Sequence, residues 1–257
     1  MDRTIEIMTE AARAGGAVLK KYFGQQLVVT EKSTVADFQT IADVESERAI
    51  VAVLSRYFPD YNINAEESGV TDKGSARTFF IDPLDGSNNF VIGVPDFSVG
   101  IALLEANSVI RAVIYHPILD QVYYALRGGG AYRDGKPLRV NAESDIRRAT
   151  LTYIPTYIYD KEYGSKLYHR LYVEKLARRY LSMWAAQINF CLLASGAIEA
   201  IITNGMELHD YLPCKLIARE AGALLTDWSG KLDEDDRNDK FVASNGTKLH
   251  EEILAVL

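Results

Sequence analysis

The chain has 257 residues, of which 48% are hydrophobic and 25% are charged, and its formal net charge is −7, a composition typical of a globular protein with a large core. The acidic balance argues against a general nucleic-acid-binding protein, which would usually be basic, and no apolar run approaches the ~20 residues of a membrane span. With no signal-peptide pattern at the N-terminus and only two cysteines, too few for a disulfide framework, we expect a cytoplasmic protein with neither membrane nor nucleic-acid partners.

Two helices separated by a loop are predicted in the N-terminal part of the chain. Apolar residues recur at helical spacing over residues 3–23 and again over 44–58. Residues 32–43 between them have poor periodicity, which predicts a loop or hairpin leading into the second helix. Asp43 stands directly before an acidic first turn, so its simplest structural role would be an N-cap.

A short strand over residues 61–65 is predicted to run into the adjacent carboxylates Glu66 and Glu67. Two neighbouring carboxylates repel each other, so a pair placed where a strand ends needs a physical reason. Solvent exposure is the simplest one, because like charges cost little free energy when water screens them. The alternative is a site that uses both charges.

The most informative stretch begins with a buried strand. The apolar run 79–81 predicts that strand, and Pro83 interrupts it because proline cannot donate a ladder hydrogen bond. Asp82, the Leu84 carbonyl and Asp85 lie within a few residues of each other, and the break is expected to turn their oxygen atoms toward one point. Oxygen ligands that converge in this way suit a hard divalent cation such as Mg²⁺.

The residues after this break favour the start of a helix. Gly86 tolerates backbone angles that other residues avoid, and Ser87 and two asparagines favour turns and helix starts. The free N–H groups of such a start would bind an anion beside the metal. An ordinary strand-to-turn corner is the alternative for a short motif, but the full run 80–90 is more specific and describes a metal-assisted phosphate site.

An antiparallel meander is predicted next, followed by a second half of the chain. Alternating strands continue through an Asp134-Gly135 hairpin turn. The polar stretch 141–146 resembles a linker, which divides the chain into an N-terminal half, 1–145, and a C-terminal half, 146–257, within one compact unit. The expected strands are 97–105, 109–116, 121–126, 150–154, 198–203 and 241–244, and the expected helices are 166–179, 188–195 and one from residue 248.

Two acidic features of the second half have simple structural explanations. Asp210 precedes an apolar-periodic helix that ends at Gly222, so the sequence predicts an N-cap there. The acidic run 233–236 is expected to be a solvated loop, because it lacks the glycine placement of a calcium-binding loop.

The run 82–90, Asp-Pro-Leu-Asp-Gly-Ser-Asn-Asn-Phe, resembles the D-P-[IL]-D-G-[ST]-x-N-F signature of the inositol monophosphatase family. Members of that family are Mg²⁺-dependent, lithium-sensitive phosphomonoesterases. Residues 32–43, 65–68 and 209–223 resemble further motifs of the family, with His209 in place of its usual tryptophan. The resemblance thus covers nearly the whole chain, and it implies an α+β fold of layered α-β-α-β-α type, as in the inositol monophosphatase and fructose-1,6-bisphosphatase group, and a homodimer.

The resemblance also implies a set of site residues. Two or three Mg²⁺ ions would be held by Glu66, Asp82, the Leu84 carbonyl, Asp85 and Asp210. Catalytic roles would fall to Lys32, Asp43, Glu67 and Ser87. Substrate would contact Asp85, Gly86, Ser87, Ala186, Thr203 and Asp210. In this scheme Asp43 pairs with the Ser87 hydroxyl, and together they orient and deprotonate the attacking water.

The identity of the substrate depends on the resemblance alone. Inositol 1-phosphate is expected, and histidinol phosphate, fructose 1,6-bisphosphate and 3′-phosphoadenosine 5′-phosphate are the alternatives. Thr203 stands where inositol phosphatases carry an acidic residue, and Glu207 lies nearby but out of register. A non-enzymatic regulatory protein with the same fold is the competing class. Such a protein would be free to lose metal ligands, yet all the matched acidic positions are present.

Overall fold

The computed structural model describes residues 2–32, 37–155 and 161–257. Its helices are α1 (Arg3–Tyr22), α2 (Ile41–Tyr57), α3 (Ser87–Val91), α4 (Lys161–Tyr168), α5 (Ala186–Ala194), α6 (Leu208–Glu220) and α7 (Leu249–Leu254). Its first ten strands are β1 (Thr30–Glu31), β2 (Phe38–Gln39), β3 (Asn62–Ala65), β4 (Gly69–Thr71), β5 (Arg77–Asp85), β6 (Ser98–Glu105), β7 (Ser108–His116), β8 (Gln121–Leu126), β9 (Gly130–Arg133) and β10 (Lys136–Pro137). The others are β11 (Thr150–Pro155), β12 (Arg179–Leu181), β13 (Ala200–Asn204), β14 (Leu224–Asp227) and β15 (Phe241–Ser244).

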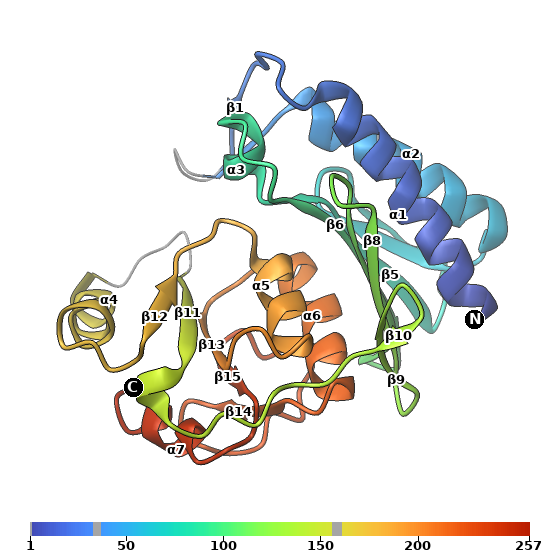
Figure 1. The fold of residues 1–257 in the computed structure, drawn as a ribbon. Helices are drawn as coiled ribbons and strands as arrows, with labels where there is room; N and C mark the ends of the chain where they lie inside the picture. The colour runs from blue at the N-terminus through green and yellow to red at the C-terminus, as the bar shows by residue number, and fades with distance from the viewer. Residues whose placement is uncertain (1, 33–36, 156–160) are drawn as a thin grey trace.

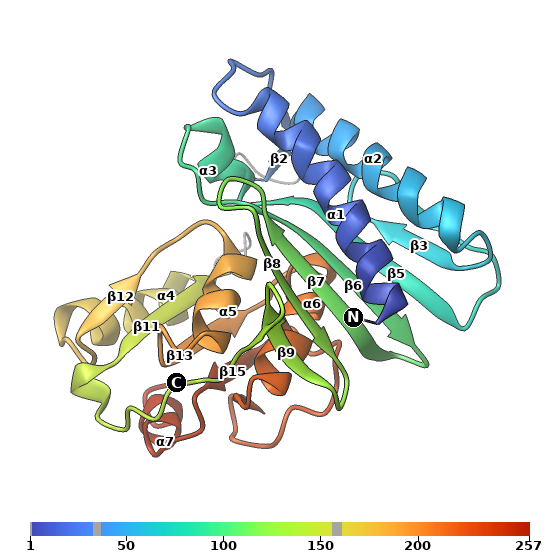
Figure 2. The same ribbon diagram turned by 45° about the vertical axis from the view of Figure 1, so that its right-hand side comes forward.

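The described residues form five layers, which confirms the predicted α-β-α-β-α arrangement. Helices α1 and α2 cover one face of an eight-stranded sheet of order β10-β9-β8-β7-β6-β5-β3-β4 (Figures 1 and 2). Helices α5 and α6 lie between this sheet and a five-stranded sheet of order β12-β11-β13-β15-β14, and α4 and α7 lie beyond it. None of the helices in the described ranges is long and apolar enough to cross a membrane.

From β6 to β10 the first sheet follows the predicted meander, in which each strand pairs antiparallel with the next. Strand β5 also pairs antiparallel with β6. Strand β3 was not part of that meander and pairs parallel with β5. Pro83 does not end β5, contrary to the prediction, because the strand continues to Asp85 through a register shift between Asp82 and Asp85. An irregularity of this kind accommodates a residue without an N–H group and turns the following side chains.

The second sheet departs from the predicted elements in the segment that leads into β12. The predicted helix over 166–179 is wrong in its C-terminal part, because α4 ends at Tyr168 and a π-helical stretch, His169–Val173, follows it. Residues 179–181 form strand β12, which pairs parallel with β11. The rings of Tyr172 and Tyr180 are tilted by 39° with their centroids 4.8 Å apart, and this contact packs the end of the helical segment against the edge strand.

The described residues contain an apolar core in each interlayer space. One core lies under α1 and α2, one surrounds α5 and α6 between the two sheets, and one lies beneath α4 and α7. The acidic run 233–236 is only partly the solvated loop that was predicted, because Glu234 and Asp235 are exposed whereas the other two residues are not. Asp233 and Asp236 are buried, and they form ion pairs with Lys215, Arg219 and Arg127.

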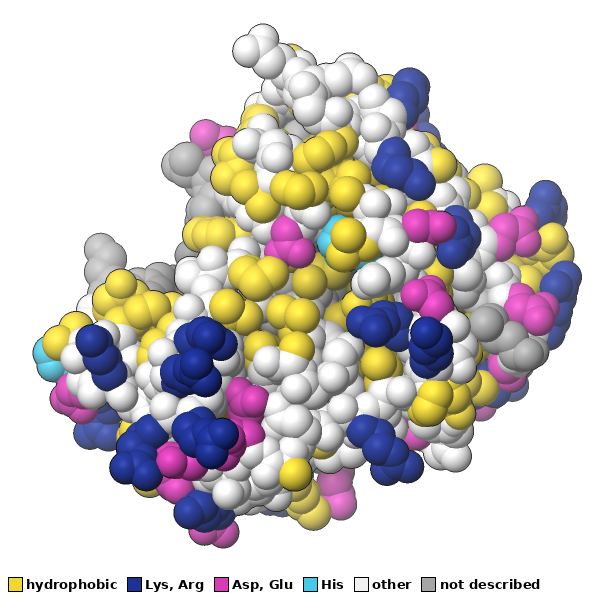
Figure 3. Space-filling model, in the orientation of Figure 1, with side chains coloured by type: hydrophobic (Ala, Val, Ile, Leu, Met, Phe, Trp, Pro, Cys, Tyr) yellow, Lys and Arg dark blue, Asp and Glu magenta, His cyan; other side chains and the backbone are white. Residues whose placement is uncertain are grey.

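The surface drawn in Figure 3 is mixed in character. Lys and Arg side chains on that face are interspersed with Asp and Glu, and hydrophobic side chains gather across its middle. A nucleic-acid-binding surface usually presents a continuous basic patch or stripe. On this face the basic side chains lie beside acidic ones.

Candidate active site

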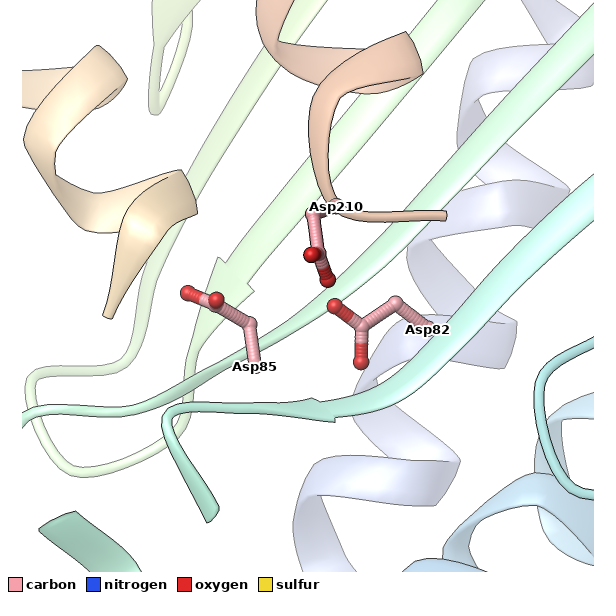
Figure 4. A group of neighbouring side chains, drawn as sticks. All are labelled: Asp82, Asp85 and Asp210. Carbon is pink, nitrogen blue, oxygen red and sulfur yellow. The ribbon is translucent and has the colours of Figure 1, made fainter. Parts of the chain in front are cut away.

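Three aspartates from two distant parts of the chain meet at the junction of the layers. Asp82 and Asp85 come from the irregular end of β5, and Asp210 comes from the first turn of α6 (Figure 4). One carboxylate oxygen from each lies within 4.8 Å of the others. Asp82 and Asp85 are 1% and 7% exposed, so the group is removed from bulk water.

The electrostatics of this group call for a cation. Burial raises the pKa of Asp85 to about 7, against hydrogen bonds from Gln187, Ser98 and Ala186 that lower it. Burial and repulsion by neighbouring carboxylates also raise the pKa of Asp82 and of Asp210 well above the ordinary value. In the described residues, none of the three forms an ion pair with a Lys, Arg or His side chain. Three carboxylates without a counter-charge, two of them buried and the third partly buried, fit a hard divalent ion such as Mg²⁺.

Helix α5 holds Asp85 in place. The backbone N–H groups of Ala186 and Gln187, at the start of this helix, donate to the two carboxylate oxygens of Asp85 at 3.0 and 2.9 Å. The positive end of the helix dipole favours a carboxylate at this position. The role foreseen for Ala186 was contact with substrate, but in this structure its N–H group binds Asp85.

The carboxylates of Glu66 and Glu67 are bridged by a lysine. Lys32 Nζ lies 2.8 Å from Glu66 Oε1 and 2.7 Å from Glu67 Oε1. The Glu67 side chain is only 4% exposed, so the simple interpretation of an exposed pair is wrong. Burial raises the pKa of Glu66 to about 7, although the nearby Lys32 opposes this rise. Burial would lower the pKa of Lys32, but the two carboxylates outweigh it and the pKa of Lys32 is raised.

The turn that carries this glutamate pair is fixed by a residue that the sequence did not single out. The carboxylate of Glu47, a buried side chain of α2, accepts the backbone N–H groups of Glu67 and Ser68 at 2.6 and 2.9 Å. Gln39 of β2 also donates to the Glu67 carboxylate. A glutamate on the inner side of a helix pattern was the only signal that could have identified Glu47.

Asp43 and Ser87 come together as the resemblance implied. Ser87 Oγ lies 3.3 Å from Asp43 Oδ1 and 2.9 Å from the Leu84 carbonyl oxygen. Asp43 is not the N-cap of α2, because Thr40 takes that place and Asp43 completes a capping box by accepting the Thr40 N–H. Burial raises the pKa of Asp43, while its hydrogen bonds from Thr40 oppose the rise.

Gly86 is required where the chain passes from β5 to α3. Its φ of 89° lies in the left-handed region, and a Cβ there would stand 3.0 Å from the carbonyl oxygens of Asp96 and Trp184. A side chain would therefore meet both strain and a steric clash. The glycine lets the backbone of the motif lie close to the segment that leads into α5.

A small cavity adjoins the carboxylates. It has a volume of about 30 Å³ and is lined by Asp37, Phe38, Glu66, Ser87, Asn88, Glu207 and Asp210. Thr203 does not support the role of substrate contact, because it is 0% exposed and its hydroxyl bonds the backbone of Phe241. Glu207, which occupies the N-cap position of α6, lines the cavity instead, and Asp210 lies inside the helix and is not the predicted cap.

Comparison with known proteins gives relatives that match along the whole chain. A model described as the inositol monophosphatase family matches residues 1–257. A Thermotoga maritima protein named fructose-1,6-bisphosphatase/inositol-1-monophosphatase is 32% identical, over 100% of this chain and 96% of its own. A Pasteurella multocida protein named Nus factor SuhB is 33% identical, over 90% and 87%. The solved structure of a Thermotoga maritima IMPase has a TM-score of 0.89 at 32% identity and covers 100% of this chain and 96% of its own. The structure of an extragenic suppressor protein suhB from Bartonella henselae has a TM-score of 0.90 at 26% identity and covers 98% of this chain and 97% of its own.

Proposed function

This chain belongs to the inositol monophosphatase family, and from that premise we propose that it is a Mg²⁺-dependent phosphomonoesterase that hydrolyses inositol 1-phosphate. The observation that carries the proposal is the convergence of Asp82, Asp85 and Asp210 within 4.8 Å in a buried space. Hydrolysis of a phosphomonoester needs charge neutralisation on the phosphoryl oxygens, a positioned water and a stabilised leaving oxygen. The arrangement of side chains supports each of these needs.

The three aspartates would hold the metal, together with Glu66 and the Leu84 carbonyl. In this structure Glu66 pairs with Lys32, and the Leu84 carbonyl accepts the Ser87 hydroxyl, so both groups would have to exchange partners to act as ligands. Bound Mg²⁺, in two or three ions, would supply positive charge to the phosphoryl group and make the attacking water more acidic. Lithium inhibition is part of the same proposal.

The protein's own groups would position the water and move its proton. Ser87 offers a hydroxyl that accepts a hydrogen bond from water and donates its own hydrogen to Asp43, 3.3 Å away. Asp43 is buried and its pKa is raised, which makes it a better proton acceptor than an exposed aspartate. The N–H groups of Gly86 and Ser87 would bind the phosphate, and Lys32 and Glu67 would supply charge at the edge of the site.

Glu207 would set the class of leaving group. Burial, and then repulsion by Asp37, raise the pKa of Glu207, and its side chain lines the cavity beside Asp210. A carboxylate at this place accepts hydrogen bonds from alcohol groups, so a phosphorylated polyol is favoured. The relatives named inositol-1-monophosphatase support the same choice. Histidinol phosphate, fructose 1,6-bisphosphate and 3′-phosphoadenosine 5′-phosphate are the alternative substrates.

A phosphate-release assay tests the proposal directly. The purified chain is incubated with the four candidate phosphomonoesters in Mg²⁺, in excess EDTA, and in Mg²⁺ with Li⁺. We expect fastest release from inositol 1-phosphate, no release in EDTA and inhibition by Li⁺. Full activity in EDTA would overturn the metal mechanism, and faster turnover of another phosphoester would reassign the substrate.

A regulatory protein is a second candidate, because several relatives are named Nus factor SuhB. Retention of the buried acidic group favours an enzyme, since a purely regulatory role would not require it. Absence of phosphate release from the whole panel, with Mg²⁺ bound, would favour the regulatory candidate. We further propose a homodimer on the basis of family membership, to be checked by light scattering.

A further inference from the structure

Gln187 contacts two members of the aspartate group at once. It is the second residue of α5 and is 0% exposed. Its side-chain Nε2 donates to Asp82 Oδ2 at 2.6 Å, and its backbone N–H donates to Asp85 Oδ2 at 2.9 Å. One residue of the C-terminal part of the chain therefore bonds both carboxylates that β5 provides.

The other end of the Gln187 amide is also bonded. Ser98 Oγ of β6 lies 3.1 Å from Gln187 Oε1 and 3.2 Å from Asp85 Oδ2, so its one hydrogen links the amide or the carboxylate. A buried amide without partners would be costly, by about 1–3 kcal/mol for each unsatisfied group. Here Nε2 donates to Asp82 and Oε1 lies within hydrogen-bonding distance of the Ser98 hydroxyl, so the amide has a polar neighbour at each end.

The neighbouring strand leaves room for this side chain. Gly100 of β6 is the sheet partner of Asp82, and a Cβ at Gly100 would stand 2.6 Å from Gln187 Cδ. Its φ does not lie in the left-handed region that favours glycine, so space and not backbone conformation calls for glycine here. Gly100 and Gln187 thus form a matched pair in which one residue lacks a side chain where the other inserts one.

We propose that Gln187 is a positioning residue that fixes the direction of the Asp82 carboxylate relative to Asp85 and thereby sets the affinity of the site for its divalent ion. This inference rests on the proposed function and deepens it. A charge-assisted hydrogen bond to a ligating carboxylate orients its free lone pairs, and loss of such a partner typically weakens metal affinity by ~10–100-fold. Gln187 acts through Asp82 and has no role as a contact of the substrate.

Calorimetric titration of the full chain with Mg²⁺ alone tests this inference without any assay of activity. Gln187→Met keeps the approximate length and the backbone N–H to Asp85 but removes the amide. We expect Gln187→Met to bind Mg²⁺ ~10–100-fold more weakly. With saturating Mg²⁺, kcat should stay within about threefold of the parent, because the loss falls on metal occupancy and not on the chemical step. A Mg²⁺ affinity equal to that of the parent would overturn the inference.

Gly100→Ala provides an independent variant that leaves the amide in the chain but displaces it. We expect Gly100→Ala to weaken Mg²⁺ binding in the parent and to have little further effect in Gln187→Ala, because the smaller side chain leaves space for the new methyl group. Additive losses in the double variant would contradict the coupling. Mg²⁺ binding by the parent without any phosphatase activity would overturn the proposed function but not this inference. A Mg²⁺ affinity of Gln187→Met equal to that of the parent would overturn this inference but not the proposed function.

Discussion

Asp85 and Asp210 bring carboxylate oxygens within 4.8 Å of each other, although one residue ends a strand of the first sheet and the other lies in the helix that separates the two sheets. The site is therefore complete only when the layers are packed together. Because repulsion by Asp85 is, after burial, the largest cause of the raised pKa of Asp210, the metal-free site works against this packing. Binding of a divalent ion should reverse that effect.

Replacement of Asp210 separates catalysis from stability. Asp210→Asn should lower turnover by about 10²-fold or more, because it removes a ligand of the metal. The metal-free variant should be at least as stable as the parent near pH 8, because one of three mutually repelling carboxylates is neutral. Phosphate release and thermal unfolding in EDTA measure the two effects.

The matched control for this variant is Asp60→Asn, at an exposed aspartate after α2. It should change neither turnover nor the unfolding midpoint. If Asp210→Asn instead lost stability and activity together in the metal-free protein, the residue would have a mainly structural role, and its place in the metal site would be in question.

The aspartate group also predicts how pH affects the metal-free protein. Burial raises the pKa of Asp85 to about 7, above its ordinary value of 3.8, and the pKa values of Asp82 and Asp210 are also raised well above that ordinary value. The unfolded chain therefore releases these protons at lower pH than the folded protein does. The contribution of Asp85 to stability is full below about pH 4 and is lost as pH rises through about 7. Asp82 and Asp210 change stability with pH in the same direction.

Thermal unfolding in EDTA should accordingly show a lower midpoint at about pH 8 than at about pH 5.5. Mg²⁺ should raise the midpoint more at the higher pH, because the ion binds the ionised carboxylates. The pH dependence should shrink in Asp210→Asn. An equal effect of Mg²⁺ at both pH values would show that these carboxylates do not form the binding site.

The sequence predicted those parts of the fold in which local pattern and tertiary packing agree. The meander strands from β6 to β8 alternate with short turns, and α1 carries an apolar stripe that packs on the sheet. The predicted helix 166–179 was wrong in its C-terminal part, because its charged and tyrosine-rich pattern fits a helix while residues 179–181 pair with β11. The acidic run 233–236 was assigned to solvent because the cations that neutralise it, such as Lys215, lie on another element.

The site was predictable at the positions that belong to recognisable sequence motifs. Asp82, Asp85 and Asp210 were identified from the sequence, whereas Gln187 was not, because a single glutamine in an apolar helix gives no signal of its own. A glycine inside a strand often marks close approach of another group, so Gly100 was the available clue. Thr203 was aligned with a substrate contact by spacing alone, but the chain between β13 and α6 carries Glu207 into that place.

Glu207 can be tested as the residue that binds the polyol. Glu207→Gln keeps the shape of the side chain but weakens its capacity to accept hydrogen bonds. KM for inositol 1-phosphate should therefore rise by about 5–10-fold, equivalent to about 1.0–1.4 kcal/mol, which is in the usual range for one hydrogen bond. Because Glu207 does not touch the reacting phosphate in the proposed arrangement, kcat should change by less than about threefold. Steady-state kinetics with inositol 1-phosphate measure both constants.

Thr203→Val is the matched comparison, since it removes a hydroxyl that bonds the backbone of Phe241. It should lower the unfolding midpoint and leave KM unchanged. A rise in KM for Thr203→Val and none for Glu207→Gln would restore Thr203 as the substrate contact.

The proton relay proposed for Ser87 and Asp43 gives the last prediction. Ser87 Oγ lies 3.3 Å from Asp43 Oδ1, and Asp43 is a buried acceptor whose pKa is raised by its burial. Ser87→Ala and Asp43→Asn should each lower kcat by roughly 10²–10⁴-fold, the usual span for positioned acid–base groups. KM should change little, because metal and backbone N–H groups bind the phosphate.

The double variant distinguishes a relay from two separate contributions. If Ser87 and Asp43 act as one unit, loss of either breaks the path, and the double variant should be scarcely slower than the slower single variant. Ser87→Thr should retain activity, because it keeps the hydroxyl, and Asn at position 43 can still accept the Thr40 N–H that Asp43 accepts now. Multiplicative losses in the double variant would show that the two residues act independently, and the water would then have to lose its proton to another group.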